Sequence, residues 1–222
     1  KEELSARKYL MKTYTCILFD WDGCLAKSLD IALYAYKVSF RKYDISLSDK
    51  KITHEVFGDW QAPQKLGIRD ITQYWEDFHK ILNKTYSHVP LYEHVQEVLT
   101  ELKKRKKKLA LVSSSRRSTL NAPLTYHKLY PYFDVIMSVD NVKKDKPNPE
   151  IVYKTLRKLR AGKSESLLVG DSKNDLLAAK SASVDSVLFY PKHNQLFYDF
   201  DILKTYDPTY IISDLRELLT TV

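Results

Sequence analysis

Short, continuous apolar runs separated by longer amphipathic stretches most constrain what this chain can fold into. The runs are unbroken rather than alternating with polar residues, which is typical of parallel strands covered on both faces. Because helical patterns lie between them, the sequence predicts an α/β fold built on a doubly wound, Rossmann-like parallel sheet. The runs are residues 14–19, 109–112, 134–138, 166–169 and 183–189, with a weaker sixth at 210–212.

Two helical patterns stand out between these runs. Residues 93–104 and 149–159 both carry apolar side chains at the spacing of one helix face. Asn148 directly precedes Pro149, which fits an N-cap followed by proline at the first helical position.

Residues 28–89 break the alternation of strand and helix. They contain no good candidate for a buried strand, but they carry helix-like stretches at 29–43 and 71–84 with several aromatic residues. We therefore expect an inserted, all-helical domain with a small core of its own. The α/β core would then comprise residues 12–27 and 90–222.

The charge balance and the cysteines limit the classes of function. The chain has 222 residues, with 36 Lys and Arg against 28 Asp and Glu, so its net charge is +8. This favours anionic partners, namely phosphorylated metabolites, nucleic acid or acidic surfaces.

No apolar run approaches the ~20 residues of a membrane-spanning helix, and no signal peptide is visible. Cys16 and Cys24 make no disulfide framework, so we expect a cytoplasmic protein without a membrane partner. The stretch before Met11 carries no motif.

Acidic residues follow two of the predicted strands at the point where each strand ends. Asp20 and Asp22 come after the first run, and Asp171 and Asp175 come after the fourth. One such residue alone is commonly a helix cap, but ligands of open α/β sheets sit outside the carboxyl ends of strands. If the two strands are neighbours, three or four carboxylates converge there and their repulsion requires a cation or a shared proton. Mg²⁺, which prefers oxygen ligands, suits such a site.

Two further segments carry groups that bind phosphate. Ser113, Ser114 and Ser115 follow the second run and open a helix, where hydroxyls and free N–H groups bind anions. Lys146 lies in a loop restrained by Pro147, and its ammonium would supply a point charge for a phosphate or for a crowded acid pair.

These four sites together resemble the haloacid dehalogenase-like (HAD) hydrolase superfamily, in its phosphatase and phosphoglucomutase-like branch with a helical cap. All four family motifs occur in order, and the resemblance runs from about residue 14 to the C-terminus. The motifs are an apolar strand with D-x-D-G-x-x-x-x-S at residues 17–28, a strand ending in Ser113, K-P-x-P-E at 146–150 and V-G-D-S-x-x-D at 169–175.

The resemblance implies a role for each matched residue. Asp20 would be the nucleophile that forms an aspartyl-phosphate, and Asp22 would protonate the leaving oxygen and later activate water. Mg²⁺ would be held by Asp20, the backbone carbonyl of Asp22 and Asp171, with Asp175 as an alternate or supporting ligand. Ser113 and the N–H of Ser114 would bind the phosphate, and Lys146 would steady the nucleophile and the phosphoryl charge.

Residues 28–89 occupy the place of the family's cap, which closes over the site and chooses the substrate. Side chains that could reach into the cleft from this segment are Lys37, Arg41, His54, Trp60, Lys65 and Arg69.

The resemblance therefore implies a monomeric, Mg²⁺-dependent phosphatase that hydrolyses a small phosphomonoester. A phosphomutase acting on a sugar phosphate would need the same motifs. The basic run at residues 103–108 raises a third reading, a nucleic-acid-binding protein or polynucleotide end-phosphatase. We favour the end of a solvated helix for this run, because no groove-reading motif or aromatic platform accompanies it.

Overall fold

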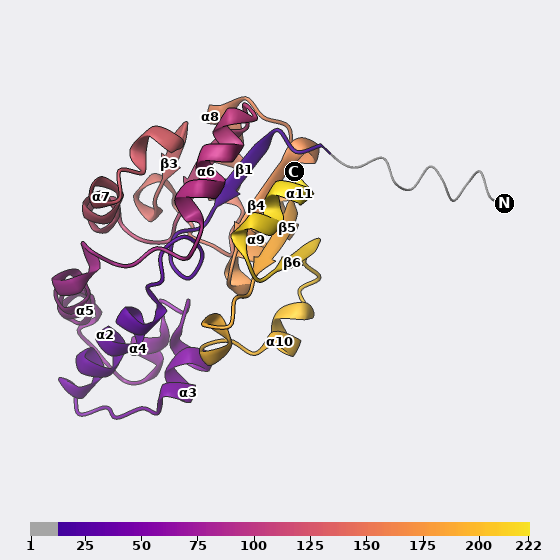
Figure 1. The fold of residues 1–222 in the computed structure, drawn as a ribbon. Helices are drawn as coiled ribbons and strands as arrows, with labels where there is room; N and C mark the ends of the chain where they lie inside the picture. The colour runs from indigo at the N-terminus through magenta and orange to yellow at the C-terminus, as the bar shows by residue number, and fades with distance from the viewer. Residues whose placement is uncertain (1–12) are drawn as a thin grey trace.

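The computed structural model describes residues 13–222 and is built around a parallel sheet (Figure 1). The six strands lie in the order β3-β2-β1-β4-β5-β6, and every neighbouring pair is parallel. The chain starts at the centre and winds outward in both directions, so the predicted doubly wound sheet is confirmed. The strands are β1 (Cys16–Phe19), β2 (Lys108–Val112), β3 (Val135–Met137), β4 (Ser166–Gly170), β5 (Asp185–Phe189) and β6 (Tyr210–Ile212).

Alternate side chains of the central strands β1, β2 and β4 enter two different cores, which explains why these strands are apolar throughout. In β1, Ile17 and Phe19 join the larger core, whereas Cys16 and Leu18 join the smaller one on the opposite face. The larger core is covered by α6 (Val95–Lys104), α7 (Arg117–Tyr126) and α11 (Leu218–Thr221), and the smaller one by α8 (Glu150–Leu159) and α9 (Lys173–Ala182).

The predicted boundaries differ from the observed ones by a few residues. The fifth run was expected to begin at residue 183, but Ser183 ends α9 with a φ of 58°, so β5 begins at Asp185. The side chain of Asn148 accepts the N–H of Glu150 at 3.0 Å, close to the predicted cap of α8. α7 is the helix expected after Ser115 and contains Pro123, whereas α10 (Phe200–Lys204) was not predicted.

Residues 28–89, called the cap segment below, lie at one end of the sheet (Figure 1). Throughout this segment, all of which the structure describes, there are helices and turns but no strand. Its aromatic interior is continuous with the larger core of the sheet, so the small separate core that we expected is not present. Its helices are α2 (Leu29–Arg41), α3 (Asp49–Lys51), the π-helical turn η2 (Ile52–Val56), α4 (Ala62–Lys65) and α5 (Ile71–Tyr86).

The described residues allow two further statements. None of the helices between residues 13 and 222 has the length and apolar character needed to cross a bilayer. Cys16 and Cys24 are buried free thiols. The predicted start of the core at residue 12 and the stretch before Met11 lie outside the described residues.

Candidate active site

The carboxyl ends of β1 and β4 bring three carboxylates together. Phe19 pairs with Val169 in the parallel register, so the residues that follow both strands emerge side by side. Asp20, Asp171 and Asp175 are buried, and each places one carboxylate oxygen within 4.8 Å of the others. The side-chain cluster predicted from the two acidic motifs therefore includes these three residues.

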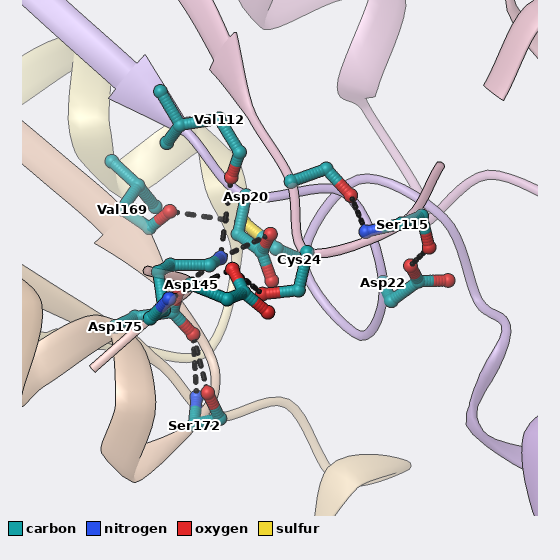
Figure 2. Close-up of polar contacts among 12 residues, drawn as sticks. Asp20, Asp22, Cys24, Val112, Ser115, Asp145, Val169, Ser172 and Asp175 are labelled. Carbon is teal, nitrogen blue, oxygen red and sulfur yellow. Dashed lines mark hydrogen bonds and ion pairs between the residues drawn. The ribbon is translucent and has the colours of Figure 1, made fainter. Parts of the chain in front are cut away.

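Lys146 is the cation inside this cluster. Its Nζ lies 2.7 Å from Oδ1 of Asp20, 2.6 Å from Oδ1 of Asp175 and 3.2 Å from the carbonyl oxygen of Val112. Figure 2 labels Asp20, Asp175 and Val112, the residues whose oxygens accept from this ammonium. Because Lys146 is only 4% exposed, its charge acts on the carboxylates with little screening by water.

Two glycines make room for the carboxylates. A Cβ on Gly23, whose φ is +75°, would lie 2.0 Å from Oδ2 of Asp171. A Cβ on Gly170 would lie 2.4 Å from the Cβ of Asp175. Any other residue at either position would push a carboxylate out of the cluster, so these glycines of the first and fourth motifs are required by space.

The crowding of buried acids changes their protonation. Burial and the neighbouring charge of Asp175 raise the pKa values of Asp20 and Asp171, and Lys146 opposes both shifts. Oδ2 of Asp171 is buried and has no hydrogen-bond partner among residues 13–222. One lysine does not balance three acids, and the Oδ2 of Asp171 lacks a hydrogen-bond partner in the described chain. Such a pocket fits a hard divalent cation, which takes oxygen ligands.

Asp175 differs from the other two acids because both of its oxygens have partners. Oδ1 binds Lys146, and Oδ2 accepts the hydroxyl of Ser172 at 2.6 Å and its N–H at 3.2 Å. Asp175 therefore stabilises the start of α9 and the position of Lys146 as well as adding charge to the cluster.

Asp22 points away from the three-carboxylate cluster. Its carboxylate accepts the hydroxyl of Ser28 at 2.7 Å, the hydroxyl of Ser115 at 2.7 Å and the phenol of Tyr86. Figure 2 shows Asp22 beside Ser115 and apart from Asp20. We expected Asp22 among the metal ligands. Three hydroxyls hold its carboxylate away from the three-carboxylate cluster, so the carboxylate is not a candidate ligand. Its backbone carbonyl is the group that the resemblance implies.

The three serines after β2 have different surroundings. The hydroxyl oxygen of Ser113 is buried and accepts the N–H of Ser115 at 3.0 Å, so it shapes the loop. Ser114 donates its hydroxyl to Oδ1 of Asp145 at 2.9 Å, and that oxygen also accepts the N–H of Lys146 at 2.7 Å. Ser114 and Ser115 line the cavity, but Ser113 does not. Tyr86 is a site residue that sequence reasoning missed, and the bond of Ser115 to Asp22 was not predicted either.

A cavity of about 580 Å³ separates these groups from the cap segment. Its floor comes from the core and includes Asp20, Asp22, Ser114, Lys146 and Asp171. The wall from the cap segment is mostly aromatic. Its aromatic members, histidines aside, are Tyr36, Phe57, Trp60, Trp75, Phe78 and Tyr86.

Most of the cap residues expected at the cleft lie elsewhere. Of the six, His54 and Trp60 line the cavity, whereas the other four do not. Lys37 and Lys65 instead form ion pairs with acids of the cap segment itself, and the side chains of Arg41 and Arg69 are exposed.

The cap segment is closed onto the core by specific contacts. Nε1 of Trp60 donates to Oδ2 of Asp145 at 3.1 Å, and Nδ2 of Asn174 donates to the carbonyl oxygen of Gly58 at 3.1 Å. Asp145 therefore connects the cap segment to the loop that carries Ser114 and Lys146.

The basic run at residues 103–108 is explained by the fold. It ends α6 and begins β2. Lys103 forms an ion pair with Asp134, and Lys107 and Lys108 donate to backbone carbonyl oxygens. These contacts favour the helix-end interpretation over a nucleic-acid surface.

The comparisons with known proteins agree with this geometry. Residues 17–189 match the model of the family described as haloacid dehalogenase-like hydrolase. "Putative pyrophosphatase PpaX" of Caldanaerobacter subterraneus subsp. tengcongensis is 32% identical over 217 residues, which cover 94% of this chain and 94% of the relative. "Pyrophosphatase PpaX" of Oceanobacillus iheyensis is 28% identical and covers 93% of this chain and 95% of the relative.

A solved structure supports the fold independently. The "putative phosphoglycolate phosphatase" of Lactobacillus plantarum superimposes with a TM-score of 0.84 at 21% identity, over 95% of this chain and 100% of that one. The family match and the curated relatives together give the assignment: the chain belongs to the haloacid dehalogenase-like hydrolases and is an enzyme of their phosphatase branch.

Proposed function

We propose that the protein is a Mg²⁺-dependent phosphatase that hydrolyses a small phosphomonoester through an aspartyl-phosphate on Asp20. The observation that carries the proposal is the position of Asp20 at the floor of the cavity. There it lies between Lys146 and the acids after β4, while Asp22 is held separately by three hydroxyls.

The residues that would hold the metal are Asp20, Asp171 and the backbone carbonyl of Asp22. The unsatisfied oxygen of Asp171 supports this assignment. We place Asp175 behind these ligands, because both of its oxygens are already bonded. When bound, Mg²⁺ would neutralise the negative charge of the phosphoryl group and of the attacking carboxylate.

In the first step, Asp20 supplies the attacking oxygen. Lys146 binds Oδ1, which orients the carboxylate and leaves the other oxygen for attack on phosphorus. The bond from phosphorus to the leaving oxygen breaks, and protonated Asp22 gives its proton to that oxygen. Ser28, Tyr86 and Ser115 fix the direction of this proton transfer. The N–H of Ser114 binds the phosphoryl group, while buried Ser113 shapes the loop that carries Ser114.

In the second step, the now ionised Asp22 takes a proton from water. The water oxygen bonds to phosphorus, the bond between Asp20 and phosphorus breaks, and phosphate leaves. Positioning and charge neutralisation account for most of the rate enhancement in such reactions. Because the cap segment of the same chain completes the cavity, we propose that the protein acts as a monomer.

The test is a panel of phosphomonoesters, with pyrophosphate included because the PpaX relatives are named for it. Phosphate release is measured with Mg²⁺ and with excess chelator, for the wild type and for Asp20→Asn. We expect release only with Mg²⁺ and only from the wild type. Equal release by Asp20→Asn would overturn the nucleophile assignment. A sugar phosphate that accepts the phosphoryl group in place of water would identify a phosphomutase.

A further inference from the structure

The wall that faces the reacting groups is uncharged and aromatic. Six aromatic side chains of the cap segment line the cavity, in addition to two histidines. Across residues 28–89, every one of which the structure describes, no Lys or Arg reaches the cavity. The part of the wall that the cap segment supplies therefore offers mainly aromatic surfaces and no Lys or Arg of its own.

The aromatic wall is tightly packed. The ring centroids of Trp60 and Trp75 are 4.8 Å apart, and those of Tyr36 and Phe78 are 4.5 Å apart. From the core side, Phe197 stacks on Phe57 with an interplanar angle of 8°. Rings that support one another in this way lose little freedom when a ligand ring packs against them.

All the charged side chains that line the cavity come from the core, and they include the acids Asp140, Asp145 and Asp199. Arg116 and Lys173 line the cavity, but they directly follow Ser115 and Ser172 in the loops after β2 and β4. His79, on the cap wall, has its pKa lowered by burial and by Arg116, so its ring is neutral at neutral pH. Its buried Nδ1 has no hydrogen-bond partner among residues 13–222 and could bond one neutral polar atom of a ligand.

The size of the cavity also bears on the leaving group. Its volume of about 580 Å³ lies in the range of sites that hold small organic ligands. Pyrophosphate and phosphoglycolate would leave much of it empty. Their second anionic group would also gain no ion pair from the cap segment, which brings no Lys or Arg to the cavity.

We propose that this cavity selects phosphomonoesters whose leaving group carries an uncharged planar ring, in preference to pyrophosphate and other anionic leaving groups. The proposal rests on the phosphatase function proposed above and names its substrate class. The ring would lie against the aromatic wall of the cap segment while the phosphoryl group lies over Asp20.

Benzyl phosphate and ethyl phosphate provide the direct comparison, because their leaving alcohols have similar acidity and differ mainly in the ring. We expect kcat/KM to be about tenfold or more higher for benzyl phosphate, the effect of one stacked ring plus its buried area. Pyrophosphate and 2-phosphoglycolate should be slower than benzyl phosphate. Equal or faster turnover of either anion, or no advantage of benzyl over ethyl, would overturn the proposal.

Adenosine 5′-monophosphate and ribose 5-phosphate separate two sources of the ring. A large advantage of the nucleotide would show that the ring is a nucleobase carried on a sugar. An advantage of benzyl phosphate without an advantage of the nucleotide would show that the ring is attached directly to the ester carbon. Both results support the proposal.

Variants of the cap segment locate the effect. Trp75→Leu should raise KM for benzyl phosphate several-fold and reduce the advantage of benzyl phosphate over ethyl phosphate. Tyr34→Leu is the matched control, because Tyr34 lies on the outer face of the same segment, 64% exposed, and should change neither. If Trp75→Leu does not fold, the substrate comparison on the wild type still decides.

The two proposals fail in different ways. If no ester and no pyrophosphate is hydrolysed in an Asp20-dependent manner, the phosphatase function is wrong. If pyrophosphate is the best substrate and its hydrolysis depends on Asp20, the function stands and the ring preference alone is wrong.

Discussion

The core floor of the cavity holds the cluster of Asp20, Asp171 and Asp175 around a buried ammonium, whereas the cap wall opposite consists mainly of aromatic side chains. The floor gathers like charges that repel one another, and a cation is needed to relieve them. The wall buries apolar area, which stabilises the fold. In the floor, the acids that the reaction needs destabilise the fold. In the wall, the rings that would bind a substrate also stabilise the fold. Neutralising an acid of the floor should remove turnover without loss of stability, and shortening a ring of the wall should lower both stability and the turnover of ring-bearing esters.

Lys146 is the exception in the floor, since it stabilises the acids around it. Lys146→Ala leaves Asp20 and Asp175 without their common partner. Removing one member of a buried ion pair costs about 3–5 kcal/mol, so we expect this loss in urea unfolding with chelator, together with loss of turnover. Lys154→Ala is the matched control, because it removes an exposed ion pair with Glu150 and should cost less than about 1 kcal/mol. Similar losses of unfolding free energy for the two variants would contradict the role of Lys146 as the buried partner of Asp20 and Asp175.

Asp22→Asn should slow turnover while leaving the floor intact. General acid–base catalysis contributes roughly 10²–10⁴-fold, and we expect a loss of that size for an alkyl ester such as ethyl phosphate. An ester with a good leaving group, 4-nitrophenyl phosphate, needs no proton in the first step. Rapid-mixing kinetics should therefore show its first turnover almost unchanged. An equal loss of the first turnover with both esters would exclude Asp22 as the acid.

The free energy of unfolding in chelator should fall as pH rises. Burial and Asp175 raise the pKa of Asp20 to about 8, above the ~3.9 of an unfolded Asp. A group with a raised pKa contributes stability that is complete below about pH 4 and is lost as pH rises through its folded pKa. Mg²⁺ should oppose this loss by stabilising the ionised carboxylates. A free energy of unfolding that increases with pH in chelator would contradict the raised pKa of Asp20.

Asp171→Asn tests whether Asp171 of the three-carboxylate cluster is a metal ligand. The change removes a buried charge whose Oδ2 has no partner in the described chain, so we expect an increase of about 1–3 kcal/mol in the stability of the metal-free protein. The increase in Tm that Mg²⁺ gives the wild type should disappear. A Tm shift as large as that of the wild type would exclude Asp171 as a ligand.

Trp60→Phe should give the smallest effect, because it retains the ring of the wall and removes one hydrogen bond to Asp145. Such a bond contributes about 0.5–1.5 kcal/mol, so kcat/KM should fall a few-fold. The fall should be similar for every substrate, since Asp145 also holds Ser114 and the N–H of Lys146. A change for ring-bearing esters alone would place Trp60 in recognition instead.

The same division explains what could be predicted from the sequence. Asp20, Asp171 and Lys146 follow directly from where strands and loops end, because parallel strands bring their carboxyl ends to one edge. Asp22 was identified, but the direction of its side chain depends on Tyr86, which lies 64 positions away on α5. Which of three consecutive serines faces the cavity is decided by a loop turn that no composition pattern records.

The aromatic wall was the least predictable region. The sequence indicated helices in the cap segment, but not which face of each helix covers the sheet. Charged residues such as Lys37 and Lys65 were expected in the cleft, yet nearby acids hold them outside it. Substrate recognition by the cap segment depends on how its helices pack, whereas catalysis depends on short motifs. The sequence is therefore far more informative about catalysis than about recognition.

Trapping the phosphoryl group on the protein tests the central claim most directly. Asp22→Asn mixed with 4-nitrophenyl phosphate and Mg²⁺ should release about one equivalent of nitrophenol in a burst, because the second step lacks its base. Acid quenching and mass spectrometry should then find the phosphoryl group on the peptide that contains Asp20, and Asp20→Asn should give neither burst nor label. Release of nitrophenol by Asp20→Asn at the wild-type rate would contradict the account.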